Sequence, residues 1–122
     1  RIISYTGTVV KGKQLGSSIG IPTANILLNH KIQLPKFGVY AVKVHVKGNS
    51  YLGCLNIGVN PTVDKDNITK NEIHILEFNE DIYHQEITYD LLDFIRDEKK
   101  FDSIEDLKAQ ILEDITNIKN NF

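Results

Sequence analysis

Thr23 and Asn25 offer two neutral oxygen ligands in a short segment that follows Pro22. Because residues two apart in an extended chain project to the same side, we expect the hydroxyl and the carboxamide to lie together. Magnesium in proteins keeps much of its water and takes a few protein oxygens together with substrate phosphates. The pair therefore indicates a magnesium site that also binds a nucleotide. The alternative is a turn that these two side chains cap by hydrogen bonds.

The segment around this pair is rich in glycine, at Gly7, Gly12, Gly16 and Gly20. Glycine lets backbone N–H groups approach phosphate oxygens closely. The spacing is not that of a P-loop, because no Lys-Ser or Lys-Thr follows the glycines, and it is not the dinucleotide fingerprint. The pattern fits either a phosphate-binding loop or the ordinary turn glycines of a β-rich fold.

Glu72 is the candidate general base. Strand alternation places it on the face that bears His74, Leu76 and Phe78, and we expect this face to open at the mouth of a β-barrel. There the carboxylate would accept a proton from an alcohol. The alternative is a solvated glutamate at a strand end. The four histidines show no metal-ligand spacing with one another or with Cys54, so the sequence predicts no zinc site.

Residues 94–103 form a charged connector, FIRDEKKFDS. One interpretation is a solvated loop. The other is a flap in which Arg96 and Lys99 reach an anionic ligand while Phe101 covers an aromatic ring.

Most of the chain before this connector is predicted to be strands. Alternating and β-branched residues indicate strands over 5–11, 38–47, 51–57, 72–78 and 85–92. A turn at 47–50 should pair 38–47, half-buried, with 51–57, and the stretch near 79–81 should pair 72–78 with 85–92.

The end of the chain changes to a helical period. Ser103 is the expected N-cap, and Asp106 falls in the first turn. Apolar residues then recur at spacings of three and four, which predicts an amphipathic helix of about four turns that ends near Asn120; they are Ile104, Leu107, Ile111, Ile115 and Ile118. Many antiparallel strands followed by one helix predict a small closed β-barrel with a helix packed outside it.

Composition limits the class of function. The chain has 122 residues, is 41% hydrophobic and 25% charged, and suits one domain over 1–122. A net charge of −2 gives no sign of general affinity for nucleic acid or anionic membranes, and no apolar run approaches the length of a membrane span. Cys54 is the only cysteine, which fits a cytoplasmic location. The absence of methionine indicates a processed chain or, as we favour, a fragment.

Several motifs, taken in order along the chain, closely resemble those of riboflavin kinases. They are Gly20-Ile21-Pro22-Thr23-Ala24-Asn25, Gly38-Val39-Tyr40, Asn56-Ile57-Gly58-Val59-Asn60-Pro61, Glu72-Ile73-His74-Ile75, Asp81-Ile82-Tyr83 and the run from Arg96 to Ser103. Any one motif could arise by chance, but the whole series is highly specific. The resemblance implies a six-stranded antiparallel closed barrel with a C-terminal helix outside it.

The resemblance also implies an activity: transfer of the γ-phosphate of ATP to the 5′-hydroxyl group of riboflavin, which gives FMN and ADP. In this family the Thr and Asn of the first motif bind Mg²⁺ and phosphate, and the Glu is the base, so these roles fall on Thr23, Asn25 and Glu72. The remaining matched positions are Gly12, Ser17, Gly20 and Tyr83 on the ATP side, and Arg96, Lys99 and Phe101 on the flavin side.

Two departures from the family pattern are visible. Ser17 stands where the family usually has Arg or Lys, so a phosphate contact is either missing or supplied by Lys11 or Lys13. The connector reads Arg96-Asp97 where the family often has Arg-Pro, which predicts a less rigid flap. In bacteria such a domain is commonly the C-terminal half of a protein whose other half adenylylates FMN to FAD, and we expect this chain to be that excised half.

Two other interpretations stay open. Ser17 would suit a catalytically weak or silent barrel that only binds flavin or nucleotide. A small β-barrel could also bind single-stranded nucleic acid, but the net charge and the lack of a basic, aromatic strand face argue against it.

Overall fold

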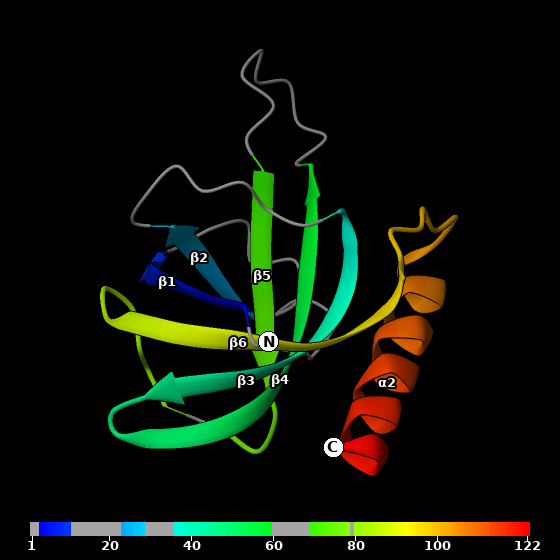
Figure 1. Ribbon diagram of the computed structural model, residues 1–122. Coiled ribbons are helices and arrows are strands. Elements are labelled where there is room, and N and C mark those ends of the chain that lie inside the picture. The colour runs from blue at the N-terminus through cyan, green and yellow to red at the C-terminus, as the bar shows by residue number, and fades with distance from the viewer. Residues whose placement is uncertain (1–2, 11–22, 29–35, 60–68, 79) are drawn as a thin grey trace.

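The computed structural model describes residues 3–10, 23–28, 36–59, 69–78 and 80–122, and six antiparallel strands in it close into a barrel (Figure 1). The order around the barrel is β1-β2-β5-β4-β3-β6. Their bounds are β1 (Ile3–Val10), β2 (Ala24–Leu28), β3 (Gly38–Val46), β4 (Asn49–Val59), β5 (Thr69–Ile75) and β6 (Glu86–Asp97), followed by the helix α2 (Ile104–Asn121). The predicted fold class, a six-stranded closed barrel with an outer C-terminal helix, is confirmed.

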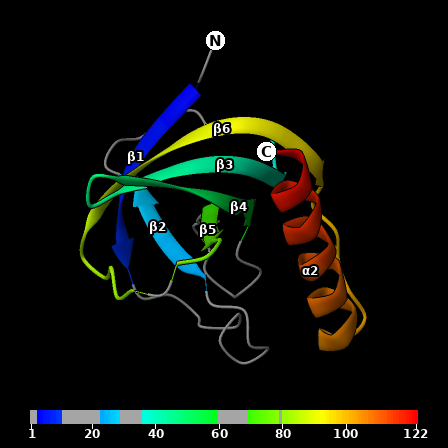
Figure 2. The same ribbon diagram turned by 90° about the horizontal axis from the view of Figure 1, so that it is seen from below.

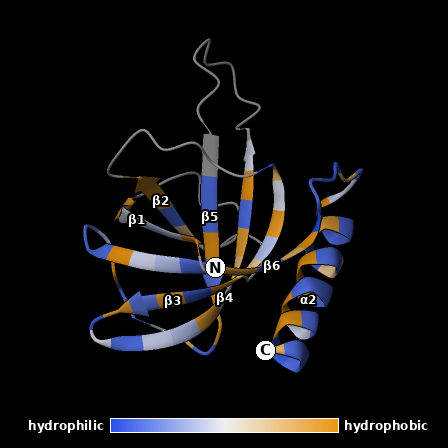
Figure 3. Ribbon diagram, viewed as in Figure 1, coloured by the Kyte–Doolittle hydropathy of each residue, from blue (hydrophilic) through white to orange (hydrophobic). Residues whose placement is uncertain are grey.

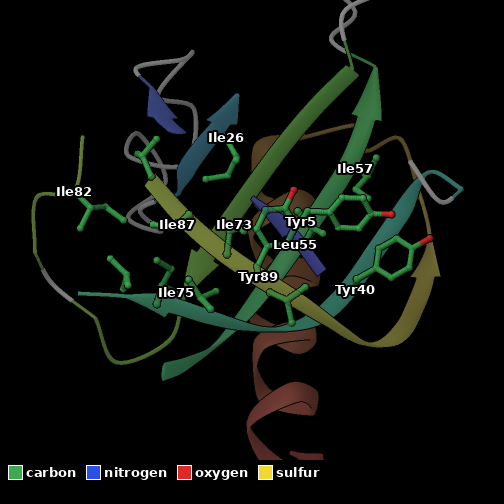
Figure 4. Packing of buried hydrophobic residues seen from close by; sticks show 14 residues of the cluster. Tyr5, Ile26, Tyr40, Leu55, Ile57, Ile73, Ile75, Ile82, Ile87 and Tyr89 are labelled. Atoms are coloured by element: carbon green, nitrogen blue, oxygen red, sulfur yellow. The ribbon is translucent and has the colours of Figure 1, made fainter. Parts of the chain in front are cut away.

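The interior of the barrel is filled by large apolar side chains. The rings of Tyr5 and Tyr89 lie 5.7 Å apart, centroid to centroid, and Leu55 and Ile73 are fully buried beside them (Figure 4). Alternation in each strand directs these residues inward, and burying each one contributes roughly 1.5–3 kcal/mol. The middle of the barrel is therefore a packed core.

The hairpin between β3 and β4 was predicted well, with one difference in burial. Lys47 and Gly48 have φ angles of 52° and 79°, as a two-residue hairpin turn requires. The sequence predicted a half-buried β3, but Val39 and Ala41 on its outer face are buried as well. The reason is α2, which packs against this face and removes it from water.

The predicted pairing of 72–78 with 85–92 is wrong. β5 lies between β2 and β4, whereas β6 lies between β1 and β3. Alternation reveals a strand but not its partner, and β6 is long enough, at 12 residues, to pair with both β1 and β3. This double pairing closes the barrel.

The helix α2 begins at the predicted N-cap. Ser103 has φ −145° and ψ 160°, and its Oγ accepts a hydrogen bond from the Asp106 backbone N–H at 3.1 Å. The helix has 18 residues, about five turns, one more than predicted. Its hydrophobic and hydrophilic residues alternate (Figure 3), and it is not apolar enough to cross a membrane. Ile118 is buried against β3 and β4, whereas Ile104 at the other end is 56% exposed.

Figures 1 and 2 agree that α2 lies outside the barrel, with the connector 98–103 between it and the end of β6. This connector carries two of the predicted site residues, Lys99 and Phe101.

Candidate active site

Glu72 is the second residue of a row of five that crosses five strands. Asn25 on β2 is its partner on one side, and Asn56 on β4 is its partner on the other. The row continues from Asn56 to Val39 on β3 and then to Arg96 on β6. Residues directly opposite each other on antiparallel strands have Cβ atoms about 4.5–5.5 Å apart and share a face of the sheet. The row therefore joins the predicted metal residue Asn25 to the predicted flavin residue Arg96.

This row is on the outside of the barrel. Ile73 and Leu55, which neighbour the row in sequence, belong to the interior core, so Glu72 and Asn56 face outward. The prediction that Glu72 points to the barrel mouth is thus wrong. It assumed an alternation that runs on to Phe78, but β5 ends at Ile75 and the chain turns at Glu77, which has a φ of 56°.

Thr23 and Tyr83, predicted to lie on the ATP side, share a pocket of about 150 Å³. Thr23 directly precedes β2, and Tyr83 lies in the segment between β5 and β6. Two backbone hydrogen bonds hold that segment against β1: His84 donates to the Val9 carbonyl at 2.8 Å, and Val9 donates to the Gln85 carbonyl at 2.9 Å. Six of the other lining residues are apolar and two are acidic: Val9, Ala24, Ile73, Ile75, Phe78 and Ile82, with Glu80 and Asp81.

The oxygen donors around Glu72 fit a magnesium ion. Asn25 supplies a neutral oxygen next to the Glu72 carboxylate on the adjacent strand. Within the described ranges there is no group of three or more His, Cys, Asp or Glu residues that could hold a metal ion. A small set of protein oxygens suits Mg²⁺, which completes its shell with water and substrate phosphates.

Three predicted ATP-side residues, Gly12, Ser17 and Gly20, lie outside the described residues. Their roles stay predictions.

Arg96 is engaged by the helix. Its Nε donates to both carboxylate oxygens of Asp114, at 3.1 and 3.0 Å, and its Nη2 donates to Oδ2 at 2.9 Å. Asp114 is only 2% exposed, and Gln110 donates to its Oδ1 at 3.1 Å. Sequence reasoning missed this partner, although a signal was present: Asp114 lies three residues after Ile111 and four before Ile118, which is an apolar position of the helical stripe.

The three predicted flavin-side residues are brought together around one ring. The Arg96 Cζ atom lies 5.9 Å and the Lys99 Nζ atom 5.6 Å from the centroid of Phe101. Both distances are within the range of a cation–π contact. A second pocket, of about 360 Å³, lies beside them between the connector and the first half of α2.

Glycines let the connector lie close to the row. A side chain at Gly58 would overlap the carboxyl group of Glu98, and a Cβ at Gly38 would come within 2.5 Å of the Arg96 carbonyl oxygen. Gly58 is two residues from Asn56 and shares its outward face. The Glu98 carboxyl group therefore lies over the same face of β4 that Asn56 and the row occupy.

Comparisons with known proteins identify relatives of the chain. The family model described as "Flavokinase: Riboflavin kinase" matches residues 1–122. The chain is 45% identical over 116 residues to the "RNA-binding riboflavin kinase RibR" of Bacillus subtilis, covering 95% of this chain and 50% of that protein. It is 44% identical over 108 residues to the "Bifunctional riboflavin kinase/FMN adenylyltransferase" of Listeria monocytogenes, covering 88% of this chain and 34% of that protein. The chain thus spans a half to a third of these relatives.

A solved structure shows the same fold. The riboflavin kinase from Trypanosoma brucei superposes with a TM-score of 0.70 at 25% identity, over 98% of this chain and 79% of that one.

Proposed function

Because the chain belongs to the riboflavin kinase family, we propose that it transfers the γ-phosphate of ATP to the 5′-hydroxyl group of riboflavin and releases FMN and ADP. The supporting observation is the outer row of residues, which places Glu72 between Asn25 at one end and Arg96 at the other. Under this proposal the base lies between the nucleotide side and the flavin side of the row, which α2 covers at Val39.

Glu72 is proposed to act as the general base. The 5′-oxygen of riboflavin attacks the γ-phosphorus, the bond from that phosphorus to the bridging oxygen of ADP breaks, and the hydroxyl proton passes to the Glu72 carboxylate. Phosphoryl transfer otherwise needs mainly positioning and charge neutralisation. A general base typically contributes about 10²–10⁴-fold to the rate.

Thr23 and Asn25 are proposed to hold Mg²⁺ with the phosphates of ATP. The metal would neutralise charge on the transferring phosphoryl group. The shared pocket of Thr23 and Tyr83 is proposed to take part of the nucleotide, because most of its wall is apolar, which suits a base, and Thr23 lies two residues before Asn25.

On the flavin side, Phe101 is proposed to cover the isoalloxazine ring, with Lys99 beside it. Arg96 is held by Asp114, so its main effect would be to fix the connector near Phe101. We also propose that the full protein works in the cytoplasm and links this domain, residues 1–122, to an FMN adenylyltransferase domain, as in the bifunctional relatives.

The test is to incubate the purified chain with riboflavin, ATP and Mg²⁺ and to separate flavins by chromatography. FMN should form, in step with ADP and only with Mg²⁺ present, and no FAD should form. Binding of both substrates without FMN would instead support the silent binding module. Accumulation of FAD would contradict the assignment of this chain to the kinase half alone.

A further inference from the structure

Asn56 belongs to the row, and its buried side-chain oxygen has no hydrogen-bond partner among the described residues. Its Oδ1 is one of three buried side-chain polar atoms that have no hydrogen-bond partner in the part of the chain described, the others being Asn71 Oδ1 and Tyr89 Oη. A buried polar atom without a partner destabilises a protein, so each one calls for an explanation. Asn71 pairs in register with the core residue Ile57, and Tyr89 itself belongs to the core, so both side chains face the apolar interior of the barrel. Asn56 alone of the three faces outward, next to Glu72.

The position of Asn56 limits which chemical group could hydrogen-bond to its side-chain oxygen. Asn56 lies on the side of Glu72 opposite to Asn25, so it is one strand closer to the flavin side. A carbonyl oxygen needs a donor, and phosphate groups only accept. The polyol chain of riboflavin, by contrast, bears hydroxyl donors next to the 5′-hydroxyl group that must meet Glu72.

The connector reaches the part of β4 that carries Asn56. Gly58, two residues further along the same face, has no side chain, and the Glu98 carboxyl group lies over it. The connector therefore approaches this face of β4 from the flavin side and would enclose an extended substituent lying along the row.

We propose that the Asn56 side chain accepts a hydrogen bond from a hydroxyl group of the flavin's polyol chain and so positions the terminal hydroxyl at Glu72. This inference rests on the proposed function. Asn56 is assigned to recognition of the polyol and not of the ring. A ligand that has the ring but no polyol therefore separates the effect of Asn56 from the effects of Phe101 and Lys99.

The experiment compares riboflavin with lumiflavin, which has the same ring but a methyl group in place of the polyol. Dissociation constants are measured by flavin fluorescence for the natural chain, Asn56→Leu and Asn71→Leu. The second variant is the matched control, since it replaces an unpartnered amide of the adjacent strand that faces the interior. We expect Asn56→Leu to weaken riboflavin binding about 3- to 10-fold, the value of one hydrogen bond, and to leave lumiflavin binding unchanged. Asn71→Leu should change neither.

Asn56→Asp keeps an acceptor oxygen in place and should retain riboflavin affinity, whereas Asn56→Ala replaces the leucine variant if that fails to fold. Equal weakening of both flavins, or unchanged riboflavin binding, would overturn the proposal. Weakened binding of Mg-ATP with normal riboflavin binding would also overturn it and make Asn56 a metal ligand. If the natural chain made FMN, any of these results would leave the proposed function standing; a natural chain that bound no riboflavin would remove both.

Discussion

The two ends of the row, which we propose serve the nucleotide and the flavin, are positioned by different interactions. At the nucleotide end, Asn25 and Glu72 lie on paired strands, and the backbone hydrogen bonds of β2 and β5 set their separation. At the flavin end, Lys99 and Phe101 lie in a connector outside the barrel, and a side-chain ion pair between Arg96 and Asp114 joins that region to α2. The first end is part of the barrel, whereas the second depends on how the helix docks.

Substitutions at the two ends of the row should therefore have different effects. Strand register can be lost only with the barrel itself, because a one-residue slip would turn every side chain to the other face. The connector and helix can open locally, since they contact the barrel through a small second cluster of buried residues, Val39, Ala41, Cys54, Leu76 and Ile118. Changes at the nucleotide end should alter catalysis with the fold intact, and changes at the flavin end should alter docking first.

The largest effect is expected at Glu72. Glu72→Gln keeps the shape of the side chain but removes its basicity, so kcat should fall about 10²–10⁴-fold while the affinities for riboflavin and Mg-ATP change little. His74→Gln is a matched control on the same outward face of β5. Steady-state kinetics and direct binding measure both quantities. A near-normal kcat would remove Glu72 from the chemistry.

The next largest effect is expected at the ion pair. Arg96→Met leaves the buried Asp114 carboxylate without its main partner, and the free energy of unfolding should fall by about 3–5 kcal/mol. Adding Asp114→Leu should restore most of the loss, because the unpaired charge is then gone. Denaturant titration of the single and double variants measures this. A loss below about 1 kcal/mol, within the usual range for exposed pairs, would mean that the ion pair does not hold the helix.

The reactivity of Cys54 reports independently on the docking of α2. Burial beneath α2 raises the pKa of its thiol to about 12, so the native protein should react slowly with thiol reagents at pH 8. Arg96→Met should increase the rate, whereas Glu72→Gln should not.

A smaller effect is expected at the junction of the connector and the helix. Ser103→Ala removes the N-cap hydrogen bond to the Asp106 N–H and should cost about 1 kcal/mol of unfolding free energy. Ser103→Asp retains a capping oxygen and serves as the control. Comparable stability of the alanine and aspartate variants would show that the cap contributes little to docking.

The smallest effect is expected away from both ends of the row. The Ser4 hydroxyl donates a hydrogen bond to the Asp90 carboxylate at 2.5 Å, and the His45 Nε2 atom lies 2.8 Å from the same carboxylate. Both contacts lower the pKa of Asp90, and the bond from Ser4 has the larger effect. A lowered pKa stabilises the fold above the aspartate's ordinary pKa, and this stability is lost as the pH falls through the folded value. Ser4→Ala should move the Asp90 pKa upward in an NMR titration and leave kcat unchanged. An unmoved pKa would contradict the assigned cause.

The sequence predicted the positions of the helix and the strands better than it predicted which strands pair. Ser103 and the apolar stripe of α2 were identified because capping and helical period are local properties. The pairing of β5 and the outward direction of Glu72 were not, because both depend on which strands meet when the barrel closes. Asp114 was missed because its partner, Arg96, is 18 residues away. The family motifs singled out Asn25, Glu72 and Arg96, and only the fold revealed the row that connects these three. The roles of Thr23, Tyr83, Lys99 and Phe101 stay predictions.

The most direct test of a row with two distinct ends is an NMR titration of the ¹⁵N-labelled chain. Mg-ADP and riboflavin are added separately, and the shifts of backbone amides are followed. We expect Mg-ADP to shift the amides of Thr23, Asn25 and Tyr83, riboflavin to shift those of Asn56, Lys99 and Phe101, and both ligands to shift that of Glu72. Riboflavin shifts confined to the nucleotide end, or Mg-ADP shifts centred on the connector, would contradict it.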